Sequence, residues 1–535
     1  METKGAKVSS TEDMGSFALD ATVPTQLSGD DAALARLGKK PVLKRSFGFM
    51  TILGFSCTIL ITWEASLFVF VSGLTNGGPA GIVYGYIVAW VGMICIFFTL
   101  SEMVSMAPTS GGQYHWVSIL SPPSIQKFLG YITGWLQLTG WQAIISSSGL
   151  LTGTMIQSLI LLTHPEYKNQ MQNWHGTLIS WAVILLNYAI NTSFNTAFAK
   201  FEGFAFVIHI LGFFAVLLPL VLLSEHATAE DVFDTFLNLG DWQTQGLSFS
   251  IGIAGTVFAL LGGDGAMHMA EEIHNPAIVL PWSLLVTLLV NGILGFGTII
   301  ALLYCLGDID TALAEDAHYP FMPILRNALG STAGAAVLSS LVAVMTFTAA
   351  TGALASTSRI YWAFARDRAI PGWRILRKTS TRTSIPFNAV TTTAVFSIIL
   401  SLINIGDATA FNGVISISIA GLLGSYLLAA CVLLYRRLTG SIREPKDDNN
   451  GVNRIGADLR WGPWRIRGAL GVITNILSIV FLVFFLFFSF WPTSRMVTPQ
   501  NFNWAVLATT VVLSFSVIYY FVWARKVYTG PIIEV

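Results

Sequence analysis

The chain has 535 residues, of which 53% are hydrophobic and only 11% are charged, and its mean hydropathy is +0.65. Soluble domains carry roughly 25% charged residues, so the composition excludes a soluble globular protein and predicts an integral membrane protein. The formal net charge is zero, so the chain as a whole favours neither an acidic nor a basic partner.

The first 46 residues are polar, with mixed charges, and they lack the apolar core of a signal peptide. Such a composition is typical of a disordered segment, so residues 1–46 are predicted to be a disordered cytosolic tail. The four cysteines all lie further along, inside apolar segments. We expect them to be reduced packing residues rather than a disulfide framework or a metal site.

Apolar stretches long enough to cross about 30 Å of hydrocarbon follow this tail, and they predict an all-α membrane protein with twelve transmembrane helices. The third and eighth stretches are overlong, so part of each is expected to lie outside the bilayer. The predicted spans are 48–74, 80–106, 124–161, 176–193, 199–223, 247–270, 281–305, 333–361, 386–405, 409–435, 468–492 and 503–524.

The positions of the basic residues set the predicted orientation, because cytosolic loops carry an excess of Lys and Arg. With the N-terminus in the cytosol, only Lys168, Arg326 and Arg495 of the 29 Lys and Arg residues fall in outward segments. Topology thereby explains the basic loops, and no nucleic-acid partner is expected. The predicted cytosolic segments include the tails 1–46 and 525–535 and the loop 436–467.

Two polar interruptions break the apolar pattern, in the first and sixth predicted spans. Asp264 is flanked by Gly262, Gly263 and Gly265, and Thr62-Trp63-Glu64 interrupts the first span. An ionised residue near the bilayer centre costs about 2.5–3.5 kcal/mol, and irregular backbone at that depth persists only where it is buried in protein or lines a cavity. The interruptions occupy corresponding positions in two five-helix halves of opposite orientation, which predicts a transporter with a solute site near the midplane.

Four motifs resemble the amino acid–polyamine–organocation superfamily. They are Ser101-Glu102 with APTSGGQYHW (107–116), EEIHNP (271–276), Ser358-Arg359 with AFARDRAIP (363–371), and LINIGDATAFN (402–412). The last motif resembles the fungal amino acid/choline transporter family, which includes GABA and choline permeases. The resemblance covers roughly residues 46–525. It implies a five-plus-five inverted-repeat (LeuT-like) core over residues 47–435, with discontinuous helices 1 and 6, and two extra helices over 468–524. It also implies alternating access and secondary active uptake.

The resemblance further implies where the substrate binds. Counting back from Asn275 places Asp264 in the unwound part of helix 6 and Phe258 at the position of an aromatic gate. Counting back from Gly77-Gly78 places Trp63, Glu64 and Ala65 at the break of helix 1. With Trp141 from the third span, the candidate substrate-binding residues are Thr62, Trp63, Glu64, Ala65, Trp141, Phe258, Gly262, Gly263 and Asp264.

This chain departs from the superfamily at the helix 1 break, where a tryptophan and an acid replace small glycine-type residues. The departure puts in doubt a cradle of backbone amides for a substrate carboxylate, and it favours a positively charged group beside Glu64. Trp63 and Phe258 could hold an ammonium group by cation–π contact worth roughly 0.5–2 kcal/mol each. The alternatives are that Glu64 is a protonated or hydrogen-bonded structural tie and that the aromatic rings only pack.

His209 lies near the middle of the fifth predicted span, where several proton-coupled relatives have a lysine whose amine replaces a sodium ion. Because histidine titrates near neutral pH, His209 is a candidate carrier of the coupling proton, together with Asp264. The alternative is a neutral imidazole bonded to a helix carbonyl. Polar side chains of the third span, including Trp141, have a similar alternative as contacts that hold transmembrane helices together.

Glu102 lies at the cytosolic end of the second predicted span. It is expected to pair with Arg359 or Arg366, either as an inward gate or as a pair that stabilises the fold.

Together these features predict a proton-coupled symporter for an amino acid, choline or a related amine, most simply in the plasma membrane. Its expected partners are the small solute, the proton and the lipid bilayer. The alternative is a nutrient sensor that keeps the transporter fold and signals through its tails. No nucleophile–base or metal-ligand spacing indicates an enzyme, and no cofactor is expected. The sequence leaves the exact substrate and the coupling ion open.

Overall fold

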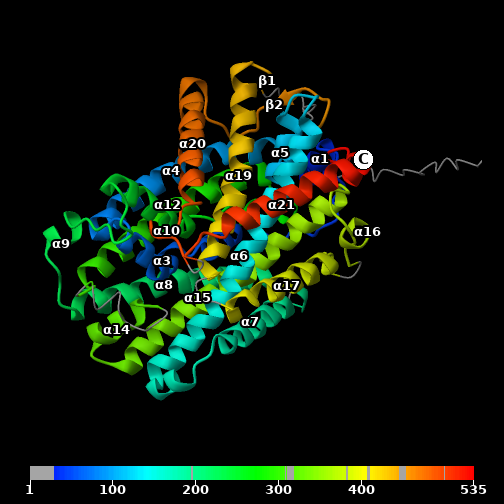
Figure 1. Ribbon diagram of the computed structural model, residues 1–535. Helices are drawn as coiled ribbons and strands as arrows, with labels where there is room; N and C mark the ends of the chain where they lie inside the picture. Colours follow the sequence, from blue (N-terminus) through cyan, green and yellow to red (C-terminus); the bar gives the residue numbers. More distant parts are fainter. Residues whose placement is uncertain are drawn as a thin grey trace, which may run out of the picture.

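The computed structural model describes residues 29–193, 197–307, 309, 319–380, 383–406, 410–444, 453–498 and 501–535, which are almost entirely helical (Figure 1). Within this part of the chain, ten helices are long and apolar enough to cross a membrane. They are α2 with α3 (Phe49–Leu60 and Thr62–Thr75), α4 (Gly78–Met106), α6 (Gln126–Thr163), α8 (Phe198–Leu223), α12 (Pro276–Tyr304), α15 (Thr332–Arg366), α17 with α18 (Phe387–Ser401 and Ile403–Gly406), α19 (Ala410–Leu438), α20 (Gly468–Phe488), and α21 (Ala505–Tyr519) with the π-helical turn η3 (Tyr520–Ala524) and α22 (Arg525–Val527).

The other two predicted spans are also helical but fall short of a typical span. Helix α7 (Asn173–Ser193) is long enough but carries many polar residues, and α10 (Gln245–Ala259) is only 15 residues long. The predicted all-α membrane architecture is therefore confirmed, with ten clear spans and two atypical helices. The motif 402–412 lies partly outside the described residues, which omit 407–409.

Shorter elements connect these helices. They are α1 (Gly29–Arg36), α5 (Gln113–Leu120), η1 (Pro165–Gln170), α9 (Ala229–Phe233), α11 (Gly265–His268), η2 (Ala270–Glu272), α14 (Phe321–Leu329), α16 (Trp373–Leu376) and two short parallel strands, β1 (Ile442–Arg443) and β2 (Leu459–Arg460). The strands lie inside the predicted loop 436–467, and α19 extends three residues into that loop.

Helix α6 runs through the bundle and packs along α19, α15 and α7 (Figure 1). Helices α2 and α3 pack against α8 and α12, and α10 packs against α3 and α4. Helices α20 and α21 are, with α8, the least buried of the long helices in the described part of the chain. They expose large apolar side chains, such as Leu470 and Ile518, as expected where a helix faces lipid rather than water.

The first predicted break is present, and it is confined to one residue. Ile61 separates α2 from α3 and has left-handed backbone angles, φ 35° and ψ 46°. A β-branched residue in this region is a genuine outlier, and such strain is retained mainly at functional sites. The break lies before Trp63, so Thr62, Trp63, Glu64 and Ala65 form the first turn of α3 rather than unwound backbone.

The second predicted break is longer. Helix α10 ends at Ala259, residues 260–264 are not helical, and α11 starts at Gly265. Gly262 has a φ of +114°, which a residue with a side chain rarely adopts. The acid and the glycines that interrupt the apolar pattern therefore mark a real interruption of the helix.

The prediction of a disordered tail over residues 1–46 is wrong for its last third, while residues 1–28 lie outside the described part. Residues 29–36 form α1, and Leu34, Leu37 and Leu43 are buried. The backbone N–H groups of Ser46 and Phe47 donate to the carbonyl of Glu272, at 2.9 and 3.1 Å. Tertiary contacts thus order a segment whose composition alone cannot drive folding.

Candidate substrate and coupling site

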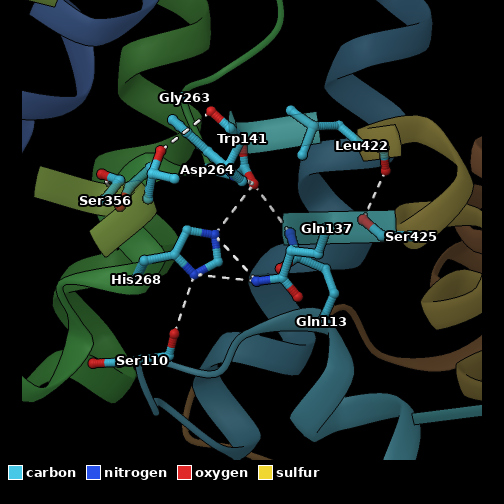
Figure 2. A network of polar contacts seen from close by, with 12 residues as sticks. Ser110, Gln113, Gln137, Trp141, Gly263, Asp264, His268, Ser356, Leu422 and Ser425 are labelled. Carbon is cyan, nitrogen blue, oxygen red and sulfur yellow. Dashed lines mark hydrogen bonds and ion pairs between the residues drawn. The ribbon is translucent and has the colours of Figure 1, made fainter. Parts of the chain in front are cut away.

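Asp264 lies at the break between α10 and α11, and its side chain is fully buried. Its Oδ2 accepts hydrogen bonds from Gln113 Nε2 at 3.1 Å and Trp141 Nε1 at 3.2 Å. His268 Nε2 lies 3.6 Å from the same oxygen. Figure 2 shows these side chains, from α5, α6 and α11, converging on one carboxyl group. Its other oxygen, Oδ1, makes no hydrogen bond of standard geometry among the described residues, although the buried Tyr426 hydroxyl of α19 lies near enough to interact with the carboxyl group.

Close packing holds the broken backbone beside Asp264. Ser56 of α2 donates to the carbonyl of Gly263 at 2.9 Å, and Ser356 of α15 donates to the carbonyl of Gly265 at 3.0 Å. A Cβ at Gly265 would lie 2.8 Å from the Trp141 ring and 3.0 Å from Ile59. Two neighbouring helices therefore satisfy carbonyls that the break leaves free, which is what irregular backbone at membrane depth requires.

Glu64 forms a second buried network on the other side of the helix 1 break. Its Oε1 lies 2.8 Å from His209 Nδ1 of α8, and both side chains are 0% exposed. Glu64 Oε2 and His209 Nε2 have no partners among the described residues. Glu64 also sits in the first turn of α3, where the partial positive charge of a helix N-terminus favours a carboxylate.

Trp63 supports His209 from the adjacent position. Its Nε1 donates to the backbone carbonyl of His209 at 3.1 Å, and its ring packs against His209 and Phe213. The first N–H of α3, that of Thr62, donates to Asn291 Oδ1 of α12 at 3.2 Å. This side chain satisfies a helix terminus that would otherwise be unpaired inside the protein. In this conformation the Trp63 side chain packs against α8 and helps to position His209.

The structure brings the predicted residues together as two groups rather than one. Asp264 contacts Trp141 of α6 directly, whereas Trp63 and Glu64 of α3 contact His209 of α8. Ile59 of α2 packs beside the second break, near the positions of Gly262 and Gly265. Phe258 is half-buried against the core, and Ala65 belongs to α3.

The expected pairing of Glu102 with Arg359 or Arg366 is wrong. Glu102 instead forms an ion pair with Arg437 of α19 and accepts a hydrogen bond from the backbone N–H of Ile466 at 2.9 Å. It faces the segment that joins α19 to α20, so it ties that segment to α4. This partner could not be predicted from the sequence, because Glu102 and Arg437 lie 335 positions apart in the chain.

The two arginines of α15 bind the acids that follow α11. Arg359 Nε donates to Glu272 at 2.9 Å, and Arg366 makes a bidentate pair with Glu271 at 2.6 and 3.0 Å. All four side chains are largely buried. These pairs fasten the end of the interrupted helix to α15.

Both ends of the described chain meet at the next residue, Asp367. It accepts from Lys39 Nζ at 2.5 Å, from the Tyr114 hydroxyl at 2.8 Å and from the backbone N–H of Ile532 at 2.9 Å. Burial alone would raise the pKa of Asp367, but the charges of Lys39 and Arg366 and these hydrogen bonds hold it below its usual value. Asp367 therefore stays ionised at neutral pH and keeps the N-terminal segment in place.

Several of these residues escaped the sequence prediction. Gln113 lies inside the motif 107–116, and His268 follows Asp264 at the i+4 spacing of a helix. Either feature could have identified these residues as neighbours of the site. Glu202 is a third buried acid, inside the apolar run of α8, and its charge in that run was also a usable signal. Among the described residues, no group of three His, Cys, Asp or Glu side chains could hold a metal ion.

A long helical bundle with two interrupted helices and buried, partly unsatisfied carboxyl groups beside the breaks is the architecture of a membrane transporter. The family model described as amino acid permease matches residues 47–513. The chain belongs to this family, and it is an integral, multi-pass membrane protein.

Three relatives illustrate the similarity. A choline transporter of Saccharomyces cerevisiae is 27% identical over 89% of this chain and 81% of its own length. Amino-acid permease 2 of Neurospora crassa is 26% identical over 98% of this chain and 93% of its own length. An uncharacterized amino-acid permease of Schizosaccharomyces pombe is 28% identical, over 95% and 90% respectively. These comparisons point to a transporter rather than an enzyme.

Proposed function

We propose that this protein is a proton-coupled symporter of the plasma membrane that takes up an amino acid, choline or a related amine by alternating access. The observation that carries the proposal is Asp264, a fully buried acid at a helix break with one carboxyl oxygen that makes no hydrogen bond of standard geometry among the described residues. A cationic group is the natural ligand for such an oxygen, because a buried charge is stable only when it is paired. The choline and amino acid relatives support the same class of substrate.

In this proposal the substrate occupies the space between the two helix breaks. Its cationic group binds Asp264 beside Trp141, and Glu64 supplies a second negative charge from the first turn of α3. Thr62, Trp63, Ala65 and Phe258 complete the proposed site, and Gly262 and Gly263 allow backbone to approach the substrate. Both acids are sealed from solvent, so the described conformation corresponds to a closed state that must open to load substrate.

The coupling proton is proposed to reside on the pair formed by His209 and Glu64, with Asp264 as a further acceptor. The two groups are 2.8 Å apart and buried, so a proton between them neutralises the pair. Binding a cationic substrate near Glu64 changes the charge that His209 experiences, which links substrate binding to proton binding.

The ion pairs around α15 are proposed to form the cytosolic gate. They are Arg359 with Glu272, Arg366 with Glu271, and Lys39 with Asp367. Glu102, expected in this gate, would act instead through Arg437. All of these pairs must rearrange for the site to open to the side that the positive-inside pattern assigns to the cytosol.

The direct test is uptake in a cell that lacks its own transporters for these solutes, with labelled choline, GABA, basic amino acids and polyamines. We expect at least one of them to accumulate above its external concentration, and a protonophore to abolish that accumulation. Accumulation that persists with the protonophore would contradict proton coupling, and uptake of none of them would contradict the substrate class.

Replacing His209 by Ala is expected to flatten the pH dependence of accumulation while substrate binding stays detectable. The reason is that His209 is the only side-chain partner of Glu64 Oε1 among the described residues, so its loss removes the imidazole that shares the coupling proton in this proposal. Uptake measured between pH 5 and 8, beside binding of the same substrate, checks this. His226→Ala is a suitable control because His226 is exposed. An unchanged pH profile would remove His209 from the coupling scheme.

A further inference from the structure

Glu202 lies one turn into α8, and its side chain is fully buried against α2. The two helices are in close contact here. A Cβ at Gly54 of α2 would lie 3.2 Å from Phe206 Cβ and 3.5 Å from the carbonyl oxygen of Glu202. A buried acid inside a membrane helix is costly and usually functional, yet the proposed substrate site and the His209–Glu64 pair do not use Glu202.

Three acceptor oxygens lie near the Thr58 hydroxyl, which can donate to only one of them at a time. Thr58 Oγ1 lies 2.7 Å from Glu202 Oε2, 3.0 Å from the carbonyl of Gly54 and 3.1 Å from that of Phe55. A threonine hydroxyl carries a single proton. When that proton points to its own helix, the short contact to Glu202 is a hydrogen bond only if the carboxyl group is the donor.

Among the described residues, no charged side chain pairs with Glu202. Its Oε1 has no hydrogen-bond partner among the described residues, and Thr58 is the only side chain found to act on the group. The charged residues on the helices packed against α8 have other partners. Glu64 of α3 pairs with His209, and Arg359 and Arg366 of α15 pair with Glu272 and Glu271. Arg326 of α14 also has an interaction of its own, and Cys57 of α2 contacts Thr287 of α12. On α8 itself, Lys200 is exposed. An unpaired carboxylate would be strongly unfavourable in this interface.

We propose that Glu202 is a proton-binding site, distinct from the His209–Glu64 pair, that is occupied while α2 is packed on α8. The ligand is the proton itself, held as a neutral carboxyl group that hydrogen-bonds to Thr58. His209 lies seven residues further along α8, about 10 Å away on the same helix face, so the two sites can be occupied separately.

Proton release from Glu202 is coupled to the position of α2. Thr58 lies just before the break at Ile61, so α2 can move relative to α3 around that residue. When α2 leaves α8, water reaches Glu202 and the carboxyl group ionises. The return of α2 requires the proton again, because it would otherwise bury an unpaired charge. This role in transport rests on the proposed symport, whereas the proton site itself does not.

Infrared difference spectroscopy of the purified full-length protein tests the proton site without any transport assay. At neutral pH, wild-type protein is expected to have the carbonyl band of a protonated, buried carboxyl group, which Glu202→Gln lacks. Thr58→Val, which removes the hydrogen-bond partner, should shift the same band in frequency. A Glu202→Gln difference spectrum that lacks this band and instead loses carboxylate bands would overturn the proposal.

Transport measurements then test the coupling role. Glu202→Gln, a permanently neutral side chain, should still exchange labelled for unlabelled substrate across the membrane but lose accumulation driven by a proton gradient. Glu225→Gln, a matched change at an exposed acid just beyond α8, should behave like wild type. Full proton-driven accumulation by Glu202→Gln would overturn the coupling role. If wild-type protein itself accumulated substrate without a proton gradient, the proposed symport would fail, while the infrared band would still decide the proton site.

Discussion

Asp264→Asn is expected to abolish concentrative uptake while the protein still folds and reaches the membrane. The amide oxygen of asparagine can still accept hydrogen bonds from Gln113 and Trp141. However, the substitution removes the negative charge and places an NH2 group, which donates rather than accepts, at the position of the second carboxyl oxygen. A hydrogen bond to a charged group contributes about 1.5–3 kcal/mol. Losing such a contact with a cationic substrate corresponds to a drop in affinity on the order of 10- to 100-fold.

Substrate binding and uptake should be measured on the same preparations, with surface expression as the check on folding. Asp234→Asn is the matched control, since Asp234 is an exposed acid on the segment between α9 and α10. Asp264→Asn protein that binds and accumulates substrate like wild type would show that Asp264 is a structural acid only.

Glu64→Gln is expected to separate cationic from zwitterionic substrates. Glutamine has the shape of glutamate and can still hydrogen-bond to His209, so the fold should be kept, but one of the two buried charges near the breaks is gone. Affinity for choline or a polyamine should fall on the order of 10- to 100-fold. A zwitterion such as GABA should lose much less, because its carboxylate already opposes its ammonium.

The measurement is competition by each substrate against one labelled substrate, so that both affinities come from the same assay. Glu225→Gln again serves as the control for an acid-to-amide change. If affinity for the cation and for the zwitterion fell equally, Glu64 would be a structural contact between α3 and α8 that does not distinguish substrates by charge.

Features that depend on local sequence were predicted well. The apolar runs gave the helical membrane architecture, because the length needed to cross hydrocarbon is a property of each segment alone. The acid and glycines around Asp264 located the second break for the same reason, since they destabilise a helix wherever it folds. The first break was placed slightly too late, because Ile61 has no sequence feature that favours a left-handed conformation.

Partners that lie far apart in the chain could not be predicted. Lys39 and Asp367 are 328 positions apart, Glu102 and Arg437 are 335 apart, and Gln113 and Asp264 are 151 apart. A single sequence contains the charges but not which of them meet. That is why Glu102 was paired with the wrong arginine, and why the sequence did not show that Glu64 and Asp264 have separate hydrogen-bond partners in this conformation.

The central claim is that the cationic group of a substrate binds at the two helix breaks, against the buried carboxyl groups. An experimental structure with bound choline, or with the amine that competes best for uptake, tests it most directly. The claim predicts substrate density beside residues 260–264, with its ammonium group contacting Asp264 and facing the first turn of α3. Density at any other place, with Asp264 still enclosed by Gln113, Trp141 and His268, would contradict it.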